Sequence, residues 1–372
     1  MSGHLRFRYF AHSWISDWNH GNAHFLRGLA RELHRLGHEV RCYEQFGAWS
    51  LTNLVDNEGE KAQQAIEQFR REFADLDVRL YEKGPNLADT LKLELRGADI
   101  VIIHEWNDPD VVNTILALKR ELGFTVLLHD THHRAYTNPG ELLKFQLQLF
   151  DGVLAFGEVI RRIYVDGFGI ERAWTFHEAA DIVHFAPRQE DHAYDLLWIG
   201  NWGDEERTRE LKEFLIEPAA ELRHLKTVVY GVRYPEEGTS ALAEAGIEFR
   251  GYIPNLTAPM AYAQSALSLH IPRRLYANGL SGIPTIRVFE ALACGAPLLC
   301  APWEDAEHLF RPGEDFVIAQ SGQEMKHAIQ WLLRDDSARQ QIAANGRETI
   351  LRRHTCAHRA AQLVEICREL MQ

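Results

Sequence analysis

The chain has 372 residues, a length that suggests two domains at the usual domain size of about 150 residues. Hydrophobic residues make up 46% and charged residues 25% of the sequence, which are ordinary proportions for a globular protein with packed cores. With 40 Lys and Arg against 53 Asp and Glu, the formal net charge is −13, and this balance disfavours general binding to nucleic acid or to anionic membranes.

The first half of the chain alternates strands with amphipathic helices. Leu26, Leu29 and Leu33 recur at helical spacing, and Gly37 ends that helix. Residues 98–106 form a nearly continuous apolar strand, as found inside parallel sheets. The alternation predicts βαβ units in a doubly wound sheet. The predicted strands are 5–10, 38–44, 98–106 and 124–130, and the predicted helices are 22–37, 60–76 and 111–123, with a helix that runs into a further strand over 142–157.

The same pattern starts again after a polar stretch, residues 186–195. The second half holds predicted strands at 196–200, 226–232, 247–254, 266–272 and 296–302, with a long predicted helix at 208–222. We therefore expect an α/β protein with two Rossmann-like domains that face a cleft, where ligands of such folds bind at the carboxyl ends of the strands. The expected domains are residues 1–187 and 188–355, followed by a C-terminal helix at 356–372 that returns to the N-terminal domain.

Cysteine usage and the chain start indicate a cytoplasmic protein. The five cysteines are scattered and include no C-x-x-C pair, which favours free thiols over a disulfide framework or a zinc site. The opening residues lack the apolar core of a signal peptide, and no later run is long enough for a transmembrane segment.

The stretch from Pro284 to Gly295 predicts an anion site. Thr285 is a good N-cap and Gly295 a good residue after the C-cap, so we expect a helix over about 286–294. The first amides of this helix would point toward the ligand side of the sheet, and phosphate commonly binds at such helix N-termini. Arg287 adds a charge suited to phosphate, and Glu290 is suited to a ribose diol. The alternative is a simple i,i+3 ion pair between Arg287 and Glu290 on an exposed face.

This segment resembles the signature of glycosyltransferases with the GT-B architecture, in particular the glycosyl transferases group 1 branch related to spore-maturation-type (CgeB-like) proteins. That branch carries a P-[ST]-x-R-x-F-E-A-x-A-C-G run before a strand, as Pro284–Gly295 does here, and an arginine ten residues before the proline, which is Arg274 here. Further similar stretches are residues 20–40, 178–187, 196–211, 251–255 and 356–372.

The resemblance implies that the C-terminal domain binds the nucleotide half of a sugar donor. By that resemblance, arginines and amides face the diphosphate, Glu290 holds the ribose, and a backbone turn reads the base edge. Positive charge suits a diphosphate leaving group, so no metal and no other cofactor is expected. The implied diphosphate residues are Arg207, Arg274, Arg287, Thr285 and Ile286, and the implied base-contacting residues are Gly251, Tyr252 and Ile253.

One position departs from the family pattern. Many retaining relatives in family 4 carry E-x₇-E, with the first glutamate on the donor sugar. The second glutamate is kept as Glu290, but the first falls on Gly282. This departure leaves open the identity of the sugar and whether the reaction retains or inverts its configuration.

Histidines and acids follow two strands of the N-terminal half. His129 and Asp130 end one predicted strand, and His104 ends another at the same edge. Such groups suit a general base for an acceptor hydroxyl or a contact to the donor sugar. The alternative is a hydrogen-bonded turn in which Asp130 acts as a cap. No recognised ligand spacing supports a metal.

The loop before the first helix is rich in aromatic and polar residues. Tryptophan faces with polar neighbours suit carbohydrate, because sugar C–H faces stack on indole and the hydroxyls need partners. Tryptophans four residues apart are equally typical of a core. The candidate acceptor or sugar contacts are Trp14, Asn19, His20 and Gly21, whose missing side chain allows close approach.

We therefore expect a metal-independent glycosyltransferase that moves a hexose-type sugar from a nucleoside-diphosphate sugar, UDP above all, to an acceptor hydroxyl. The acceptor is a carbohydrate, a lipid-linked saccharide, a small molecule or a protein. Two alternatives remain: a sugar-nucleotide epimerase or hydrolase on the same fold, and a non-catalytic relative that binds nucleotide-sugars. A dinucleotide-dependent dehydrogenase is disfavoured, because neither domain opens with G-x-G-x-x-G.

Overall fold

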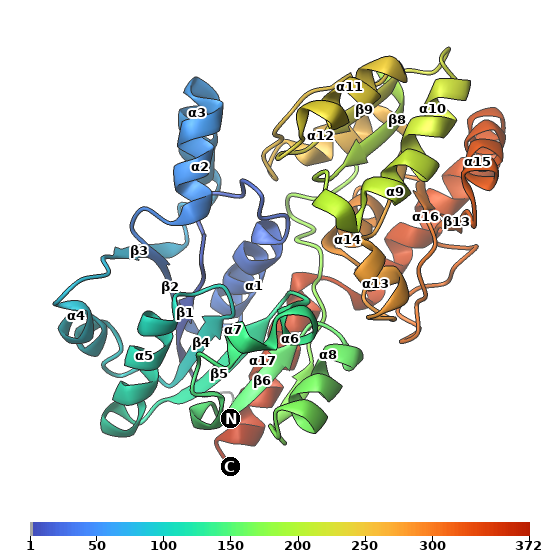
Figure 1. Ribbon diagram of the computed structural model, residues 1–372. Coiled ribbons are helices and arrows are strands. Elements are labelled where there is room, and N and C mark those ends of the chain that lie inside the picture. The colour runs from blue at the N-terminus through green and yellow to red at the C-terminus, as the bar shows by residue number, and fades with distance from the viewer. Residues whose placement is uncertain (1–2) are drawn as a thin grey trace. The chain divides into compact units, whose positions relative to one another are not determined.

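The computed structural model describes residues 3–372, which form two compact α/β units (Figure 1). The first unit consists of the residues up to Glu178 together with Cys356–Gln372, and the second unit consists of Ala179–Thr355. The chain thus passes into the second unit somewhat before residues 187–188, where the sequence places the boundary. It returns to the first unit at the start of the C-terminal helix.

The first unit is built on a seven-stranded sheet in which every pairing is parallel, in the order β3-β2-β1-β4-β5-β6-β7. The side chains of the central strand Ile100–His104 are completely buried, as expected for an apolar strand covered on both faces. The strands are β1 (Arg6–Phe10), β2 (Glu39–Gln45), β3 (Asp77–Tyr81), β4 (Ile100–His104), β5 (Thr125–Asp130), β6 (Gly152–Ala155) and β7 (Ala173–Thr175).

Helices connect and cover these strands. Helix α1, near the start of the chain, packs beside α17 at its end, so the red end of the ribbon lies among the elements of the first unit (Figure 1). The Sγ of Cys356 lies 3.8 Å from the carbonyl oxygen of Phe25 at this contact. The helices are α1 (Ala23–Arg35), α2 (Trp49–Glu58), α3 (Glu60–Glu72), α4 (Leu87–Glu94), α5 (Pro109–Leu122), α6 (Arg134–Thr137), α7 (Pro139–Leu142), α8 (Glu158–Arg162) and α17 (Cys356–Leu370).

The second unit repeats the arrangement with six parallel strands in the order β10-β9-β8-β11-β12-β13. The strands are β8 (Tyr194–Ile199), β9 (Thr227–Tyr230), β10 (Glu248–Phe249), β11 (Ser265–His270), β12 (Leu298–Cys300) and β13 (Val317–Ile318). The helices are α9 (Thr208–Leu211), α10 (Glu217–Glu221), α11 (Glu236–Glu244), α12 (Ala258–Ala263), α13 (Arg274–Asn278), α14 (Ile286–Ala293), α15 (Gly322–Arg334) and α16 (Asp336–Arg353).

Both sheets reverse their winding at one point, which confirms the predicted fold class of two doubly wound α/β sheets. In the first unit the strand order runs outward from β1 to β3 and then resumes on the other side of β1 with β4. In the second unit the reversal lies between β8 and β11. Open α/β sheets bind ligands at such switch points, beyond the carboxyl ends of the strands. We call that side of each sheet its carboxyl edge.

Helix α5 shows how local sequence sets these elements. Asp108 is the N-cap and its carboxylate accepts the amide of Asp110 at 2.9 Å, while Pro109 occupies the first helical position. Gly123 ends the helix with φ +77°, in the left-handed region where glycine is favoured. The segment 142–157 contains the predicted strand as β6, but the helix predicted before it is wrong, because only a short 3₁₀ turn over Leu147–Leu149 precedes β6.

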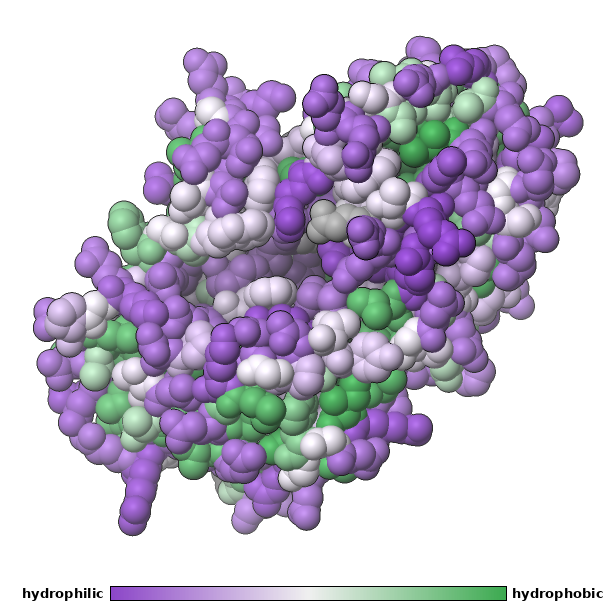
Figure 2. Space-filling view, viewed as in Figure 1, coloured by the Kyte–Doolittle hydropathy of each residue, from purple (hydrophilic) through white to green (hydrophobic). Residues whose placement is uncertain are grey.

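The surface carries no continuous apolar band in the view of Figure 2, where hydrophobic residues form separate patches among hydrophilic ones. Within residues 3–372, none of the helices combines the length and the apolar character that a membrane crossing requires.

Candidate functional site

The loop after β8 wraps closely around Arg207. Gly203 has φ +77°, and a β-carbon there would meet the Arg207 β-carbon at 3.1 Å. A β-carbon on Gly200 would meet the Trp198 ring at 2.6 Å, so both positions need glycine. Arg207 donates from Nη1 to the carbonyl of Asn201 at 3.1 Å, and its guanidinium lies 5.7 Å from the centroid of the Trp198 ring. The loop therefore fixes the position of this cation at the carboxyl edge of the second unit.

The electrostatic environment of Arg207 is unfavourable for a cation. Burial lowers the pKa of Arg207 to about 10, and the charges of Arg273 and Arg287 act in the same direction. Its Nε is buried without a hydrogen-bond partner among the described residues. An anion among these three guanidinium groups would supply the hydrogen bonds and opposite charge that Arg207 lacks.

Arg273 and Arg274 follow β11 on the other side of the switch point. Arg274, the arginine that the family pattern selects, forms a two-pronged pair with Glu210 at 2.8 and 3.1 Å. Arg273 pairs with Glu206 at 2.8 Å and is the neighbour whose charge acts on Arg207. Sequence reasoning missed Arg273. The signal available was its place three residues after the end of β11, one residue before the arginine that was chosen.

Helix α14 begins at this edge with Thr285 as its N-cap residue, close to the predicted span of 286–294. The Thr285 side chain does not cap the helix, because its hydroxyl shares a hydrogen bond of 3.1 Å with Nε2 of His270. Burial, with Arg207 acting in the same direction, lowers the pKa of His270 to about 3 and keeps it neutral. The first-turn amides, including those of Ile286 and Arg287, are thus left without a side-chain cap beside a group of arginines.

Arg287 and Glu290 form the i,i+3 pair that was the alternative prediction, but not on an exposed face. Glu290 is 0% exposed, and its Oε2 accepts hydrogen bonds from Nη1 of Arg287 and, at 3.1 Å, from the hydroxyl of Tyr262. Burial opposes the charge of Arg287, yet the Glu290 carboxylate outweighs this effect, so the pKa of Arg287 is raised. Arg287 therefore stays charged in a half-buried setting, and its charge also acts on Arg207. A contact between Glu290 and a ribose remains a prediction.

The predicted base-contacting turn follows β10 at the same edge. Gly251 has φ +72°, and its carbonyl accepts the amide of Gly231 at 2.8 Å. Tyr252 and Ile253 follow it and are only partly buried, so this backbone is open to a ligand. Reading of a base by this turn remains a prediction.

Gly282 has a structural reason for departing from E-x₇-E. Its φ of +94° is one that side chains other than glycine rarely adopt. A β-carbon there would lie 3.3 Å from Cγ of Glu307 and 3.4 Å from the β-carbon of Ala306. A glutamate at this position would be strained and crowded.

The three predicted bases of the first unit, His104, His129 and Asp130, are all fully buried. Asp130 accepts hydrogen bonds from the His132 amide at 2.9 Å and from the Tyr164 hydroxyl at 2.7 Å. Burial raises the pKa of Asp130 to about 6. This is the capped turn that was the alternative to a catalytic role.

His129 has the surroundings of a core histidine. Its Nδ1 is hydrogen-bonded to the Tyr9 hydroxyl, and its ring packs edge-on against Phe25 and Phe176. Burial lowers its pKa to about 3. Nε2 of His104 shares a hydrogen bond of 2.9 Å with the Thr131 hydroxyl. Both histidines are therefore buried behind the carboxyl edge, and their role as a base for an acceptor hydroxyl remains a prediction.

His12, two residues beyond the end of β1, is the partly exposed member of this histidine group. Its ring centroid lies 4.0 Å from that of His20 and 5.1 Å from that of His104. Burial, with Arg134 acting in the same direction, lowers the pKa of His12 to about 3, so the ring is neutral. Its Nδ1 has no hydrogen-bond partner among residues 3–372. Sequence reasoning missed His12, although it follows a strand end as His104 does.

The tryptophans of the loop after β1 belong to the core. Trp14 is 0% exposed, and its Nε1 donates to the carbonyl of Tyr43 at 3.2 Å. The buried Glu44 carboxylate accepts the amides of Trp14 at 2.5 Å and Ile15 at 2.9 Å. Because its ring is enclosed, Trp14 offers no face to a sugar, and the core alternative describes it correctly. Trp18 is buried as well.

The remaining predicted acceptor contacts lie in the turn that leads into α1. Asn19 has φ +51° and is half-buried, as is Gly21, whereas His20 is buried against His12. Arg27 holds the preceding loop by donating to the carbonyl of Trp14 at 2.8 Å. The structure thus places His20 beside His12 and His104, whereas Asn19 and Gly21 lie at the margin of this histidine group.

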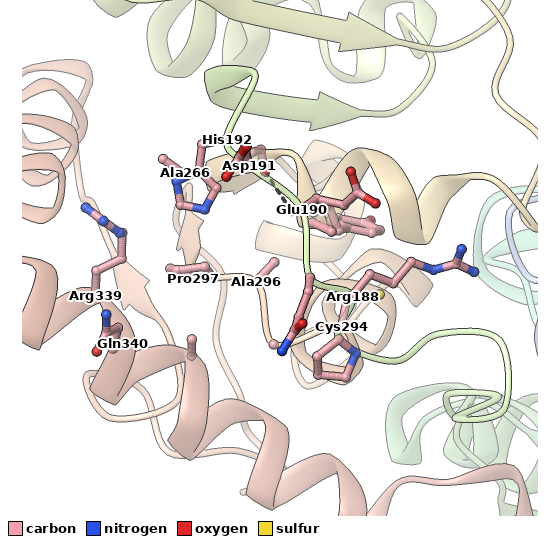
Figure 3. Close-up of a pocket in the computed structure, with 17 residues that line it drawn as sticks. Arg188, Glu190, Asp191, His192, Ala266, Cys294, Ala296, Pro297, Arg339 and Gln340 are labelled. Carbon is pink, nitrogen blue, oxygen red and sulfur yellow. Dashed lines mark hydrogen bonds between the residues drawn. The ribbon is translucent and has the colours of Figure 1, made fainter.

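A separate cavity of about 660 Å³ lies at the opposite, amino edge of the second unit (Figure 3). Its walls include Arg188 and Arg339 as well as Glu190 and Asp191, so its charges are mixed. Arg339 is already paired with Asp336 at 2.6 Å. None of the predicted donor residues lines this cavity, which separates it from the arginine group.

No set of three or more His, Cys, Asp or Glu side chains within the described part of the chain is arranged to hold a metal ion.

Comparison with known protein families matches part of the chain. Residues 207–365 match the family model described as glycosyl transferase-like, a stretch that begins at Arg207 and includes Arg273, Arg287 and Glu290. A search of curated protein sequences finds no match.

Solved structures of glycosyltransferases share the fold along nearly the whole chain. A glycosyltransferase from Rickettsia africae is 11% identical, with a TM-score of 0.67, over 100% of this chain and 99% of that one. Anabaena HepE in complex with UDP and glucose is 15% identical, with a TM-score of 0.70, over 97% and 99%. Sucrose-phosphate synthase from Thermosynechococcus elongatus is 14% identical, with a TM-score of 0.68, over 99% and 99%. The chain therefore has the two-domain GT-B fold.

Proposed function

We propose that the protein is a glycosyltransferase that uses a nucleoside-diphosphate sugar, with UDP as its nucleotide, and needs no metal ion. The observation that carries the proposal is the group of Arg207, Arg273 and Arg287 at the carboxyl edge of the second unit. Burial and mutual repulsion depress the pKa of Arg207, and a diphosphate would relieve both effects. The glycosyl transferase-like match over these residues and the UDP bound to a protein of the same fold support this assignment.

The chemistry follows from where charge develops. The acceptor oxygen forms a bond to the anomeric carbon of the sugar, while the bond from that carbon to the diphosphate oxygen breaks. The electron pair leaves with the nucleoside diphosphate, and the acceptor proton passes to a base. The arginines and the first amides of α14 stabilise the negative charge that grows on the leaving group. The turn Gly251–Ile253 reads the base, and Glu290 holds the ribose once Arg287 turns to the phosphate.

On the acceptor side we propose His12 as the group that meets the acceptor hydroxyl. The residue is partly exposed and its ring is neutral, and its Nδ1 is a buried atom without a hydrogen-bond partner among the described residues. His104 and His129 lie behind it and hold its surroundings in place. The three buried residues first predicted as bases are then positioning residues.

A thermal-shift screen against UDP-, GDP-, dTDP- and ADP-sugars tests donor binding. At a free concentration of about 100 times its Kd, the true donor should stabilise the native state by about 2.7 kcal/mol. Stabilisation by UDP-sugars that is lost in Arg287→Ala is the expected result. No stabilisation by any of the four would overturn the proposal.

Product analysis then separates the enzyme classes. With donor alone, an epimerase or hydrolase converts the sugar nucleotide, whereas a transferase needs an added acceptor for turnover above background. Tight UDP binding with no turnover of any donor would instead identify a non-catalytic binding protein.

A further inference from the structure

The N-cap residue of helix α14 uses its side chain differently from the N-cap residues of α5, α15 and α16. In those three helices the N-cap side chain, Asp108, Ser321 or Asp335, accepts a hydrogen bond from an amide in the first turn of its own helix. Thr285 has the extended backbone of an N-cap, with φ −76° and ψ 161°, and is a favoured capping residue type. Its hydroxyl nevertheless makes no such bond. The Thr285 side chain could therefore cap α14, but it is engaged elsewhere.

His270 is the group that engages the Thr285 hydroxyl. It ends β11 and is 2% exposed, and its Nε2 lies 3.1 Å from the hydroxyl oxygen. The imidazole packs edge-on against the Trp303 ring, with centroids 6.0 Å apart, so its position is fixed by packing. Because the pKa of His270 is lowered to about 3, the ring stays neutral near pH 7. A fixed, neutral ring thus keeps the hydroxyl away from the amides of α14.

The first amides of α14 are left open as a result. The Val288 amide donates to the Thr285 carbonyl at 3.0 Å, and the amides of Ile286 and Arg287 lie before this first backbone bond. Amides at the start of a helix carry the positive end of the helix dipole and bind anions well. A hydroxyl that capped the helix would occupy one of these donors.

Two buried nitrogen atoms beside this helix start indicate that an anion binds here. Nε of Arg207 and Nδ1 of His270 have no hydrogen-bond partner within residues 3–372. The charge of Arg207 acts on His270, and the charge of Arg287 acts on Arg207, so the three side chains share one electrostatic environment. A diphosphate would accept hydrogen bonds from Arg207 and from the open amides at the same time.

We infer that His270 is a positioning residue of the donor site, which holds the Thr285 hydroxyl off the first amides of α14 and so keeps them open to the diphosphate. This inference rests on the proposed function and adds a residue that acts on the donor through Thr285. Without His270, the hydroxyl would turn to cap the helix, as Asp108 does in α5, and a diphosphate would have to displace it.

The experiment is a double-mutant cycle on the full chain, with binding of UDP and of inorganic pyrophosphate measured by calorimetry. The variants are His270→Phe, which keeps an aromatic ring but no hydrogen bond, Thr285→Val, which removes the hydroxyl, and the combination of the two. His270→Gln is the conservative variant, because its amide nitrogen can take the place of Nε2. Urea unfolding verifies that each variant is folded, and His270→Leu serves as the second apolar replacement if His270→Phe does not fold.

We expect His270→Phe to weaken UDP and pyrophosphate binding about 5-fold, since a hydroxyl cap that must be displaced contributes about that factor. His270→Gln should retain most of the affinity. In the Thr285→Val background, His270→Phe should cause no further loss, because no hydroxyl is present to compete for the amides. A residue that only supports the fold would cause the same loss with and without the hydroxyl.

Equal losses from His270→Phe in the two backgrounds, or no loss in either, overturn the inference while UDP binding by the wild-type chain leaves the proposed function standing. If the wild type shows the expected pattern with pyrophosphate but does not bind UDP, the inference holds and the proposed nucleotide is wrong. If the wild type binds neither, both the inference and the proposed function are contradicted.

Discussion

The two units share one topology, but their carboxyl edges carry opposite chemistry. The edge of the second unit holds Arg207, Arg273 and Arg287 around a glycine loop and a helix start. The edge of the first unit holds neutral histidines and exposed aromatic rings. The difference teaches that a common scaffold leaves function to the loops after the strands.

The largest expected effect is at Arg207. Arg207→Ala should weaken UDP binding by about 100-fold, because a hydrogen bond to a charged group contributes about 1.5–3 kcal/mol and the Nε of Arg207 is buried without a partner among the described residues. Calorimetry with UDP measures the change. Arg209→Ala is the matched control, since Arg209 lies two residues further on and is exposed. Equal affinities of Arg207→Ala and Arg209→Ala for UDP would contradict the difference proposed between the two carboxyl edges.

The neutral histidines of the first unit should make the free energy of unfolding depend on pH. The folded-state pKa of His129, about 3, lies below its ordinary value of 6.5, so the unfolded chain binds more protons between those values. The unfolding free energy should therefore fall as pH drops below about 6.5, by up to about 1.4 kcal/mol per pH unit from this group. His129→Gln should flatten this slope in urea unfolding series.

The two proteins are compared by the slope of the unfolding free energy against pH, because His129→Gln itself lowers stability at every pH. Asp130, with its pKa raised to about 6, acts in the opposite direction but is present in both proteins, so it cancels in the comparison. Parallel curves for wild type and His129→Gln would show that this ring is not held neutral.

Substitution of Arg273 or Arg274 should change UDP binding less, and the comparison tests which of the two arginines acts at the Arg207 position. Arg273→Ala should weaken UDP binding about 10-fold, since its charge acts on the Arg207 position. Arg274→Ala should have less effect, because Glu210 already matches its guanidinium and the pair is partly exposed. Competition binding against a fluorescent UDP analogue distinguishes them. The reverse order would favour the arginine chosen from the family pattern.

The effect at Gly282 is expected on stability and not on UDP binding. Gly282→Ala should lower the unfolding free energy by about 1–2 kcal/mol, because its φ of +94° is strained for alanine. Gly279→Ala is the control in the same loop, since Gly279 has φ −118°. Chemical denaturation measures both. If the two variants are equally stable, backbone strain does not explain the absence of glutamate at 282.

The sequence predicts the fold and helix α14 well, because hydrophobic periodicity and capping residues act locally. Thr285 and Gly295 bound this helix within one residue of the expected span. The same signals fail for the helix predicted before β6, where apolar residues at mixed spacing suit a helix or a loop equally and tertiary packing decides.

The site is predicted less completely, because exposure is a tertiary property. Trp14 and Trp106 have similar sequence surroundings after strand ends, yet one is enclosed by Glu44 and Tyr43 and the other stands open. Likewise, a turn decides whether Arg273 or Arg274 acts on Arg207, and sequence spacing does not show how that turn runs.

Calorimetric binding of UDP and of uridine to the wild-type chain and to Arg207→Ala tests the central claim most directly. If the arginine group is a diphosphate site, UDP should bind the wild type at least about 100-fold more tightly than uridine does, and Arg207→Ala should remove most of that difference. Equal affinity of the wild-type chain for UDP and uridine would contradict the claim.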